Sequence, residues 1–510
     1  MELFIKIALL VLFFGVMIFV GLRCRRHAVN VNSFVLGGRS VGPWLTAFAY
    51  GTSYFSAVIF IGYAGQFGWK FGLASTWIGI GNAIIGSLLA WVILGRRTRL
   101  ITQKLSSATM PDFFEKRFSS PALKIVSSLI VFVFLIPYTA SLYNGLSRLF
   151  NMAFNIDYVW CIIIMSVLTG IYVILGGYMA TAINDFIQGI VMLFGIVAVI
   201  VAVLNSNGGF MESIVKLSNV PAGDVNGGFA SFFGPDPFNL LCVIILTSLG
   251  TWGLPQMIGK FYAIKDEKAV STGTIISTIF ALVVAGGCYF LGGFGRIANI
   301  EVVDGKPVGG FDAIIPAMLN NLPAILIGIV VILVLSASMS TLSSLVMTSS
   351  STLTLDLIKG SIKKDMKEKT TMVIMKVLVA VFIAISAVIA IFKDSLPNIA
   401  QLMGISWGAL AGAFLAPYLF SLYWKRTTKA SVFACFGFGV GVMLLNMFVP
   451  SIFPTWLQSP INCGAMTMLA GFIIVPIVSL ITPKPNKEKV DEIFSCYDRT
   501  VTTTVKEHLE

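Results

Sequence analysis

The sequence predicts an all-α polytopic membrane protein, and three observations point to this fold class. Of the 510 residues, 57% are hydrophobic and only 11% are charged, a balance typical of chains embedded in lipid. Apolar runs of about 20 residues, the length of helix that crosses about 30 Å of hydrocarbon, recur along the whole chain. These runs lack the alternation of apolar and polar residues that a transmembrane β-barrel requires.

We expect 13 transmembrane helices from these runs. Their approximate limits are 3–22, 44–66, 74–95, 121–149, 157–175, 180–204, 237–262, 271–294, 322–355, 371–392, 398–423, 429–449 and 463–481. The first run precedes the basic sequence RCRRH at 23–27, whereas a cleaved signal peptide carries its positive charge before the apolar core. Residues 1–27 are therefore expected to form a retained N-terminal transmembrane helix.

Lysine and arginine are distributed unevenly between the two sets of loops that 13 helices would produce. Of the 35 basic residues, 28 fall in the loops at 23–43, 95–124, 260–270, 356–376, 425–429 and 484–510. The opposite side holds the other seven, which include Lys6 and Lys393. Because basic loops favour the cytoplasm, we expect a multi-pass protein of the cell membrane with its N-terminus outside and a cytoplasmic tail at 482–510. This basic tail either rests on anionic membrane lipid or only adds solubility.

The charged and sulfur-containing residues exclude several classes of function. The formal net charge of +12 does not indicate nucleic acid as a partner, because the charge follows the loops. The seven cysteines form no CxxC pair, and the two histidines, His27 and His508, lie in a basic loop and near the C-terminus. We expect no disulfide framework and no histidine-based metal or catalytic site at membrane depth. Enzymatic activity is therefore not expected.

Two predicted helices are interrupted near their middle. The second contains GTSYFSA at Gly51–Ala57, and the seventh contains GTWGLP at Gly250–Pro255. Such breaks free backbone carbonyls and amides, which is tolerated where they line a cavity or meet polar groups. The two helices begin successive groups of five, 44–204 and 237–423, which predicts an inverted repeat with a binding site at the midplane. Two ordinary kinked helices are the alternative. The segments outside this 5+5 core are the extra N-terminal helix at 1–27, the two extra C-terminal helices at 429–481 and the tail at 482–510.

The ninth predicted helix carries an unusual run of hydroxyls in its second half. A helix in lipid gains little from hydroxyls unless they face protein, water or an ion. Ala337, Ser340 and Thr341 lie on one face of this helix because they are three and four residues apart. Together with freed carbonyls of Thr52 and Phe55, they would supply the oxygen atoms that a hard cation such as sodium requires. Close packing of helices, which serine and threonine also permit, is the alternative.

Asp185 is an acidic residue within the predicted helix at 180–204. An ionisable side chain inside a membrane helix is a functional candidate by default. Two roles remain open for it from the sequence. It either caps or orients a neighbouring helix near the inner interface, or it binds a second cation together with Ser340, Ser343 and Ser344.

Three motifs occur in order along the chain: GGYMATAINDFIQG at 176–189, AIKDEKAV at 263–270 and SASMSTLSS at 336–344. Together they resemble the sodium:solute symporter family, and the resemblance covers about residues 3–481. It implies a LeuT-type fold with sodium as the coupling ion. It implies a principal sodium site at Thr52, Phe55, Ala337, Ser340 and Thr341. In members with a second sodium ion, the matching residues are Asp185, Ser343 and Ser344.

The same resemblance places a solute between the two broken helices and the third core helix. The matching residues are Tyr54, Phe55, Ala57 and Val58 on the first broken helix, Tyr138, Ser141 and Asn144 on the third core helix, and Trp252, Pro255 and Gln256 on the second broken helix.

Different residues of the chain resemble family members that carry different solutes. IKDEKAV and the Gly-Leu-Pro at 253–255 resemble the pantothenate carriers of the family, whereas Pro255 and Tyr138 resemble its proline carriers. Tyr54 stands where the proline carriers have an aspartate, and Pro137 stands where sialic-acid carriers have a carboxylate-binding arginine. We expect a small carboxylate-bearing solute: proline or another small amino acid, pantothenate or a monocarboxylate.

These observations predict a sodium-coupled secondary active symporter that imports a small organic solute by alternating access. Sodium ions, the solute and membrane lipid are the expected partners, with no obligate protein partner. A membrane solute sensor is the alternative, and it would act with a separate partner because the 29 residues after Ile481 are too few for a catalytic domain. A sodium channel is a further alternative, which saturable counterflow of a labelled solute would separate from a carrier.

Overall fold

The computed structural model describes residues 2–154, 156–222, 226–298, 300–303, 305–320, 322–392 and 399–498. Within these residues the structure is almost entirely helical, with a short antiparallel hairpin formed by β1 (Val302–Val303) and β2 (Lys306–Pro307). Lys393 and the last part of the predicted tail, 499–510, lie outside the described residues.

The described α-helices are α1 (Glu2–Cys24), α2 (Val31–Leu36), α3 (Pro43–Tyr54), α4 (Ala64–Phe71), α5 (Thr76–Gly81), α6 (Arg96–Lys104), α7 (Met110–Phe118), α8 (Pro121–Phe154), α9 (Tyr158–Ser206), α10 (Phe210–Ser218), α11 (Pro237–Ile244), α12 (Pro255–Ala263), α13 (Glu267–Gly292), α14 (Ile314–Leu319), α15 (Ala324–Thr352), α16 (Glu368–Ile391), α17 (Ile399–Tyr423), α18 (Lys429–Phe448), α19 (Pro460–Ile481) and α20 (Lys487–Phe494). Longer stretches of wider or tighter helical turns continue several of them: Val58–Tyr63, Asn82–Leu89, Trp91–Gly95, Ile245–Leu249, Gly250–Gly253 and Leu353–Ile362. Short single turns are Arg25–His27, Gly37–Arg39, Gly72–Ser75, Gly228–Ala230, Gly295–Ile297, Phe311–Ala313, Pro450–Ile452, Thr455–Leu457 and Ser495–Tyr497.

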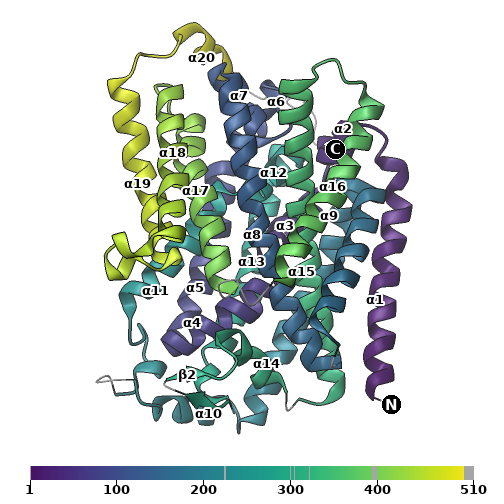
Figure 1. Cartoon of the computed structure of the whole chain (residues 1–510), viewed down its shortest axis with the longest axis vertical. Helices are drawn as coiled ribbons and strands as arrows, with labels where there is room; N and C mark the ends of the chain where they lie inside the picture. The colour runs from purple at the N-terminus through teal and green to yellow at the C-terminus, as the bar shows by residue number, and fades with distance from the viewer. Residues whose placement is uncertain are drawn as a thin grey trace, which may run out of the picture.

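The helices form a bundle whose two ends carry different elements (Figure 1). α1 packs against α9 along one side, while α17, α18 and α19 pack together on the other. α15 is largely buried and packs against α3, α8 and α9. One end carries α6, α7 and α20, and the opposite end carries α10, α14 and the β-hairpin. We call the first of these the basic end, because α6 contributes Arg96, Arg97, Arg99 and Lys104 to it.

Ten described helical segments are long and apolar enough to cross a membrane, and the helix pair that bends before Pro255 would make eleven. Two of the ten, Val58–Lys104 and Tyr158–Ser206, have 47 and 49 residues, about twice the length that one crossing requires. Each contains a glycine with a positive φ, Gly72 at 62° and Gly177 at 56°, where a helix running straight through would be interrupted. The all-α polytopic fold class is confirmed, and the exact count of 13 helices stays a prediction.

Both predicted mid-helix interruptions are present, and they have nearly the same backbone geometry. α3 ends at Tyr54, and Phe55 is extended (φ −81°, ψ 118°) before helix resumes at Val58. In the second interruption Leu254 is extended in the same way (φ −84°, ψ 120°), and α12 begins at Pro255 after a bend of 45°. Proline suits this first helical position because it lacks the amide hydrogen that would have no partner there. Each break therefore opens the backbone inside the bundle.

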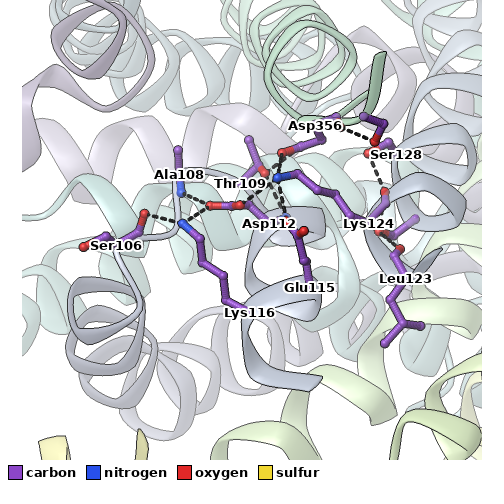
Figure 2. Close-up of polar contacts among 12 residues, drawn as sticks. Ser106, Ala108, Thr109, Asp112, Glu115, Lys116, Leu123, Lys124, Ser128 and Asp356 are labelled. Carbon is purple, nitrogen blue, oxygen red and sulfur yellow. Dashed lines mark hydrogen bonds and ion pairs between the residues drawn. The ribbon is translucent and has the colours of Figure 1, made fainter. Parts of the chain in front are cut away.

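A cluster of buried charges joins α7, α8 and the continuation of α15 at the basic end (Figure 2). Lys124 Nζ lies 3.0 Å from Asp112 Oδ1 and 2.7 Å from Glu115 Oε2. The same nitrogen lies 4.0 Å from Asp356 Oδ1, and Thr109 donates a 2.7 Å hydrogen bond to Oδ2 of Asp356. The side chains of Lys124 and Asp356 are 10% and 1% exposed. Lys124 therefore contacts three carboxylates that are largely withdrawn from water, and Lys116 Nζ, 2.8 Å from Asp112 Oδ2, supplies a second positive charge to Asp112.

Replacing this lysine tests how strongly the cluster holds the basic end together. We expect Lys124→Met to lower the free energy of unfolding by about 3 kcal/mol, because it removes the ammonium beside the buried carboxylate of Asp356. Lys216→Met is the control, because Lys216 pairs with Glu212 at 2.8 Å on the surface and should cost less than about 1 kcal/mol. Chemical unfolding in mixed micelles measures both values, and equal losses in the two variants would contradict this account.

Candidate functional site

The hydroxyls of Ser340 and Thr341 on α15 face the opened end of α3. Ser340 Oγ lies 3.1 Å from the carbonyl oxygen of Thr52 and 3.0 Å from that of Ala337. Thr341 Oγ1 lies 3.0 Å, 3.2 Å and 3.1 Å from the carbonyl oxygens of Thr52, Phe55 and Ala337. The five residues predicted for the principal sodium site therefore lie together, and we call their three carbonyls and two hydroxyls the oxygen cluster.

The break after Tyr54 explains why α3 has carbonyls to offer. A helix end leaves its last carbonyls without amide partners from the following turn, and Phe55 leaves the helical conformation at this point. Both Thr52 and Phe55 are buried. Hydroxyls from α15 take the place of the missing amides, so the break is stabilised by a second helix.

The oxygen cluster contains more acceptors than donors. A hydroxyl has one hydrogen and two lone pairs, yet Thr341 Oγ1 is within 3.2 Å of three carbonyl oxygens. One hydrogen cannot satisfy three carbonyls at once. Such a concentration of uncharged oxygen atoms is complementary to a small hard cation, which prefers oxygen ligands.

Two of the residues predicted for a second sodium ion, Asp185 and Ser344, lie beside a lysine. Lys260 Nζ on α12 donates a 3.0 Å hydrogen bond to Ser344 Oγ and lies 3.8 Å from Asp185 Oδ2. Ser344 Oγ also lies 2.7 Å from Ser53 Oγ on α3. The hydroxyl of Ser343 donates instead to the carbonyl of Ser340 on its own helix, at 2.9 Å. Asp185 and Ser344 thus share a cation that belongs to the protein itself.

The burial of this pair makes each charge depend on the other. The side chains of Lys260 and Asp185 are 5% and 0% exposed, and neither carboxylate oxygen of Asp185 accepts a hydrogen bond within the described part of the chain. An isolated buried charge is costly, whereas a paired one is tolerated. We call Lys260, Asp185 and Ser344 the charged cluster.

Among the predicted solute-binding residues, Tyr54 and Tyr138 meet at Trp407 of α17. The ring of Trp407 lies 6.3 Å from that of Tyr54 and 5.9 Å from that of Tyr138, with an interplanar angle of 88° in the second case. The hydroxyl of Tyr138 is 3.5 Å from the carbonyl oxygen of Tyr54. A methyl group added at Gly250 would come within 3.3 Å of the Trp407 ring. Trp407 therefore contacts all three segments that were expected to surround a solute.

Some of the remaining predicted solute-binding residues form side-chain hydrogen bonds, and others form none within the described residues. Ser141 donates to the carbonyl of Tyr138 at 2.6 Å, and the indole of Trp252 donates to the carbonyl of Ile85 at 2.9 Å. Asn144 Oδ1 and both side-chain polar atoms of Gln256 are buried without a hydrogen-bond partner in the described residues. The other predicted members, Ala57, Val58 and Pro255, are buried and apolar.

A cavity reaches the charged cluster from residues of α2, α7, α9, α12 and α15. Its lining includes Met110, Gln256, Lys260, Ser344 and Thr352. Gln256 and Lys260 are four residues apart on α12, so both can face the same side of that helix. An amide that has no hydrogen-bond partner among the described residues and a buried ammonium thus line one cavity.

Sequence reasoning missed three residues of this region: Ser53, Lys260 and Trp407. Lys260 was assigned to the loop at 260–270, although it follows Gln256 at helical spacing on an apolar segment. That spacing was the signal that could have identified it. Trp407 lies far from the other residues in sequence, and only the packing of α17 brings it to them.

Comparisons with known proteins identify the family and the fold of the chain. The model of the sodium:solute symporter family matches residues 34–439. The osmoregulated proline transporter OpuE of Bacillus subtilis is 29% identical over 483 residues, which cover 93% of this chain and 94% of that protein. A sodium/proline symporter of Staphylococcus aureus is 30% identical over 492 residues, which cover 94% and 92% of the two chains. A solved sodium-coupled sialic acid symporter has a TM-score of 0.73 at 16% identity and covers 94% of this chain and 98% of its own.

The fold is the predicted LeuT-type architecture of sodium-coupled transporters. The chain belongs to the sodium:solute symporter family, because the family match spans most of its length. Membership implies sodium as the transported coupling ion.

Proposed function

We propose that this protein is a secondary active symporter that uses the sodium gradient to import a small carboxylate-bearing solute. The observation that carries the proposal is the oxygen cluster, in which Ser340 and Thr341 of α15 meet the opened carbonyls of Thr52 and Phe55. A sodium ion bound there touches two different elements. Its binding free energy then depends on how those elements are placed, which is the physical requirement for coupling an ion to a conformational change.

The coupling follows from the position of the cluster between the two predicted halves, 44–204 and 237–423. Thr52 and Phe55 belong to the first half, and Ala337, Ser340 and Thr341 belong to the second. When the halves move apart the ion loses ligands, so sodium favours the arrangement that keeps them together. With the predicted orientation in the cell membrane, N-terminus outside and C-terminus in the cytoplasm, each inward-moving charge gains about 2.3 kcal/mol per 100 mV of membrane potential.

Proline is the solute that the relatives support most directly, because two of them are named as proline transporters. The aromatic surface of Tyr54, Tyr138 and Trp407 suits a small ring, and Asn144 and Gln256 offer polar atoms without partners in the described chain. Sodium and the amide nitrogen of Gln256 would meet the carboxylate, whereas the oxygen of Asn144 can accept a hydrogen bond from a donor of the solute. Pantothenate and short monocarboxylates share that carboxylate, and they are the competing candidates.

Uptake into proteoliposomes tests the proposal. We expect labelled proline to accumulate when sodium is placed outside and not when potassium replaces it. Unlabelled proline, pantothenate and lactate added in excess then identify the preferred solute by competition. Equal uptake in sodium and in potassium would contradict sodium coupling, and lack of competition by every carboxylate would contradict the solute class.

Removing one hydroxyl of the oxygen cluster tests the sodium site. We expect Ser340→Ala or Thr341→Ala to raise the sodium concentration for half-maximal uptake about tenfold, the effect of losing about 1.4 kcal/mol of binding free energy. Ser338→Ala is a matched control on the same helix, because Ser338 donates at 2.8 Å to the carbonyl of Val334 in its own helix. An equal shift in the control would assign the effect to α15 in general.

Replacing Gln256 tests whether its amide binds the solute. We expect Gln256→Leu to weaken solute affinity about tenfold, as loss of a hydrogen bond to a charged group does, while the sodium concentration for half-maximal uptake changes little. Gln103→Leu on α6 is the control, because its amide oxygen accepts from Arg99 at 2.9 Å at the basic end. Measurement of uptake against solute concentration decides the outcome, and unchanged solute affinity in Gln256→Leu would remove this residue from the site.

A further inference from the structure

Lys260 is held by groups from two other helices inside the bundle. Its ammonium donates to Ser344 Oγ of α15 at 3.0 Å and lies 3.8 Å from Asp185 Oδ2 of α9. It also lies 5.3 Å from the centre of the Tyr178 ring, a geometry in which an aromatic face attracts a cation. A carboxylate, a hydroxyl and an aromatic face thus surround one positive charge.

Asp185 and Ser344 are also residues that the family resemblance assigns to a second sodium ion. An ammonium and a sodium ion carry the same charge and both bind oxygen atoms. A sodium ion coordinated by Asp185 and Ser344 would stand close to Lys260, and two positive charges at that distance repel each other strongly in a buried site. The single negative charge of Asp185 therefore balances one monovalent cation, and Lys260 already supplies that cation.

We propose that the Lys260 ammonium is a tethered cation that takes the place of a second sodium ion in this protein. The inference rests on the proposed sodium-coupled function and specifies its stoichiometry: one sodium ion, bound at the oxygen cluster, moves in each cycle. Lys260 lies on the helix that resumes after the break at Pro255. It therefore joins the second broken helix to α15, while Ser53, at 2.7 Å from Ser344, joins the first broken helix to the same point.

The tethered charge affects how transport depends on the sodium concentration. A lysine is part of the chain and cannot be exchanged with solution. The occupancy of the charged cluster by a cation therefore does not depend on the external sodium concentration. Sodium activation of transport should then be hyperbolic. Removing the ammonium leaves Asp185 as a buried carboxylate without a counter-charge, which is the condition that favours binding of a cation from solution.

Equilibrium binding of radioactive sodium to the purified full-length protein tests this inference directly. We expect one sodium ion bound per wild-type chain, two per chain of Lys260→Met, and one per chain of the double variant Lys260→Met/Asp185→Asn. Lys6→Met is the matched control and should bind one, because the ammonium of Lys6 donates to the carbonyl of Ala153 at 3.2 Å on another part of the bundle.

Sodium-dependent thermal stabilisation gives a second measurement on the same samples. At high sodium concentration the stabilisation should rise linearly with the logarithm of that concentration, with the slope of one bound ion for the wild type and the double variant and twice that slope for Lys260→Met. Two ions bound to the wild type would overturn the inference, and so would a folded Lys260→Met that binds one. If Lys260→Met does not fold, a wild-type count of two would still overturn the inference. If the wild type binds no sodium, the proposed function itself fails, which distinguishes that result from failure of the tethered cation alone.

Discussion

The contact between the α15 hydroxyls and the opened carbonyls of α3 is the interaction on which the functional region depends. A helix broken inside a membrane must satisfy its freed backbone groups within the protein. Here Ser340 and Thr341 approach the carbonyls of Thr52 and Phe55 at 3.0–3.2 Å. The arrangement stabilises the break, and the same surplus of oxygen atoms is the basis of the proposed sodium site. Structure and proposed function thus have one physical origin.

The two clusters to which α15 contributes differ in the charged groups that they contain. The oxygen cluster includes no formally charged side chain, so a sodium ion adds a charge without meeting one. The charged cluster already holds a buried ammonium and a buried carboxylate at 3.8 Å. Ser340 and Ser344, one helical turn apart, therefore face environments that differ in whether a cation of the protein is already present. This difference, rather than the number of hydroxyls, decides where a cation from solution is favoured.

Long-range packing completes the region around these clusters. Trp407 of α17 lies against Tyr54 and Tyr138, and it approaches the backbone of the second break at Gly250. At the basic end, Lys124 joins α7 and α8 to the continuation of α15 through its contacts with Asp112, Glu115 and Asp356 (Figure 2). α15 is thus held near its middle by α3 and towards one end by charges. A shift of this helix relative to its neighbours would change both sets of contacts.

The sequence by itself determined the all-α membrane class, the two interrupted helices and the residues of the oxygen cluster. These follow from local properties: apolar length, glycine and proline in mid-helix, and hydroxyls three or four residues apart. Only the tertiary structure decided that Lys260 turns inward to Asp185, that Ser53 meets Ser344 and that Trp407 joins three distant segments. The reason is physical, since contacts between remote helices depend on packing: the helical spacing of Lys260 from Gln256 indicates its face of the helix, but no local pattern encodes which residue of another helix it meets.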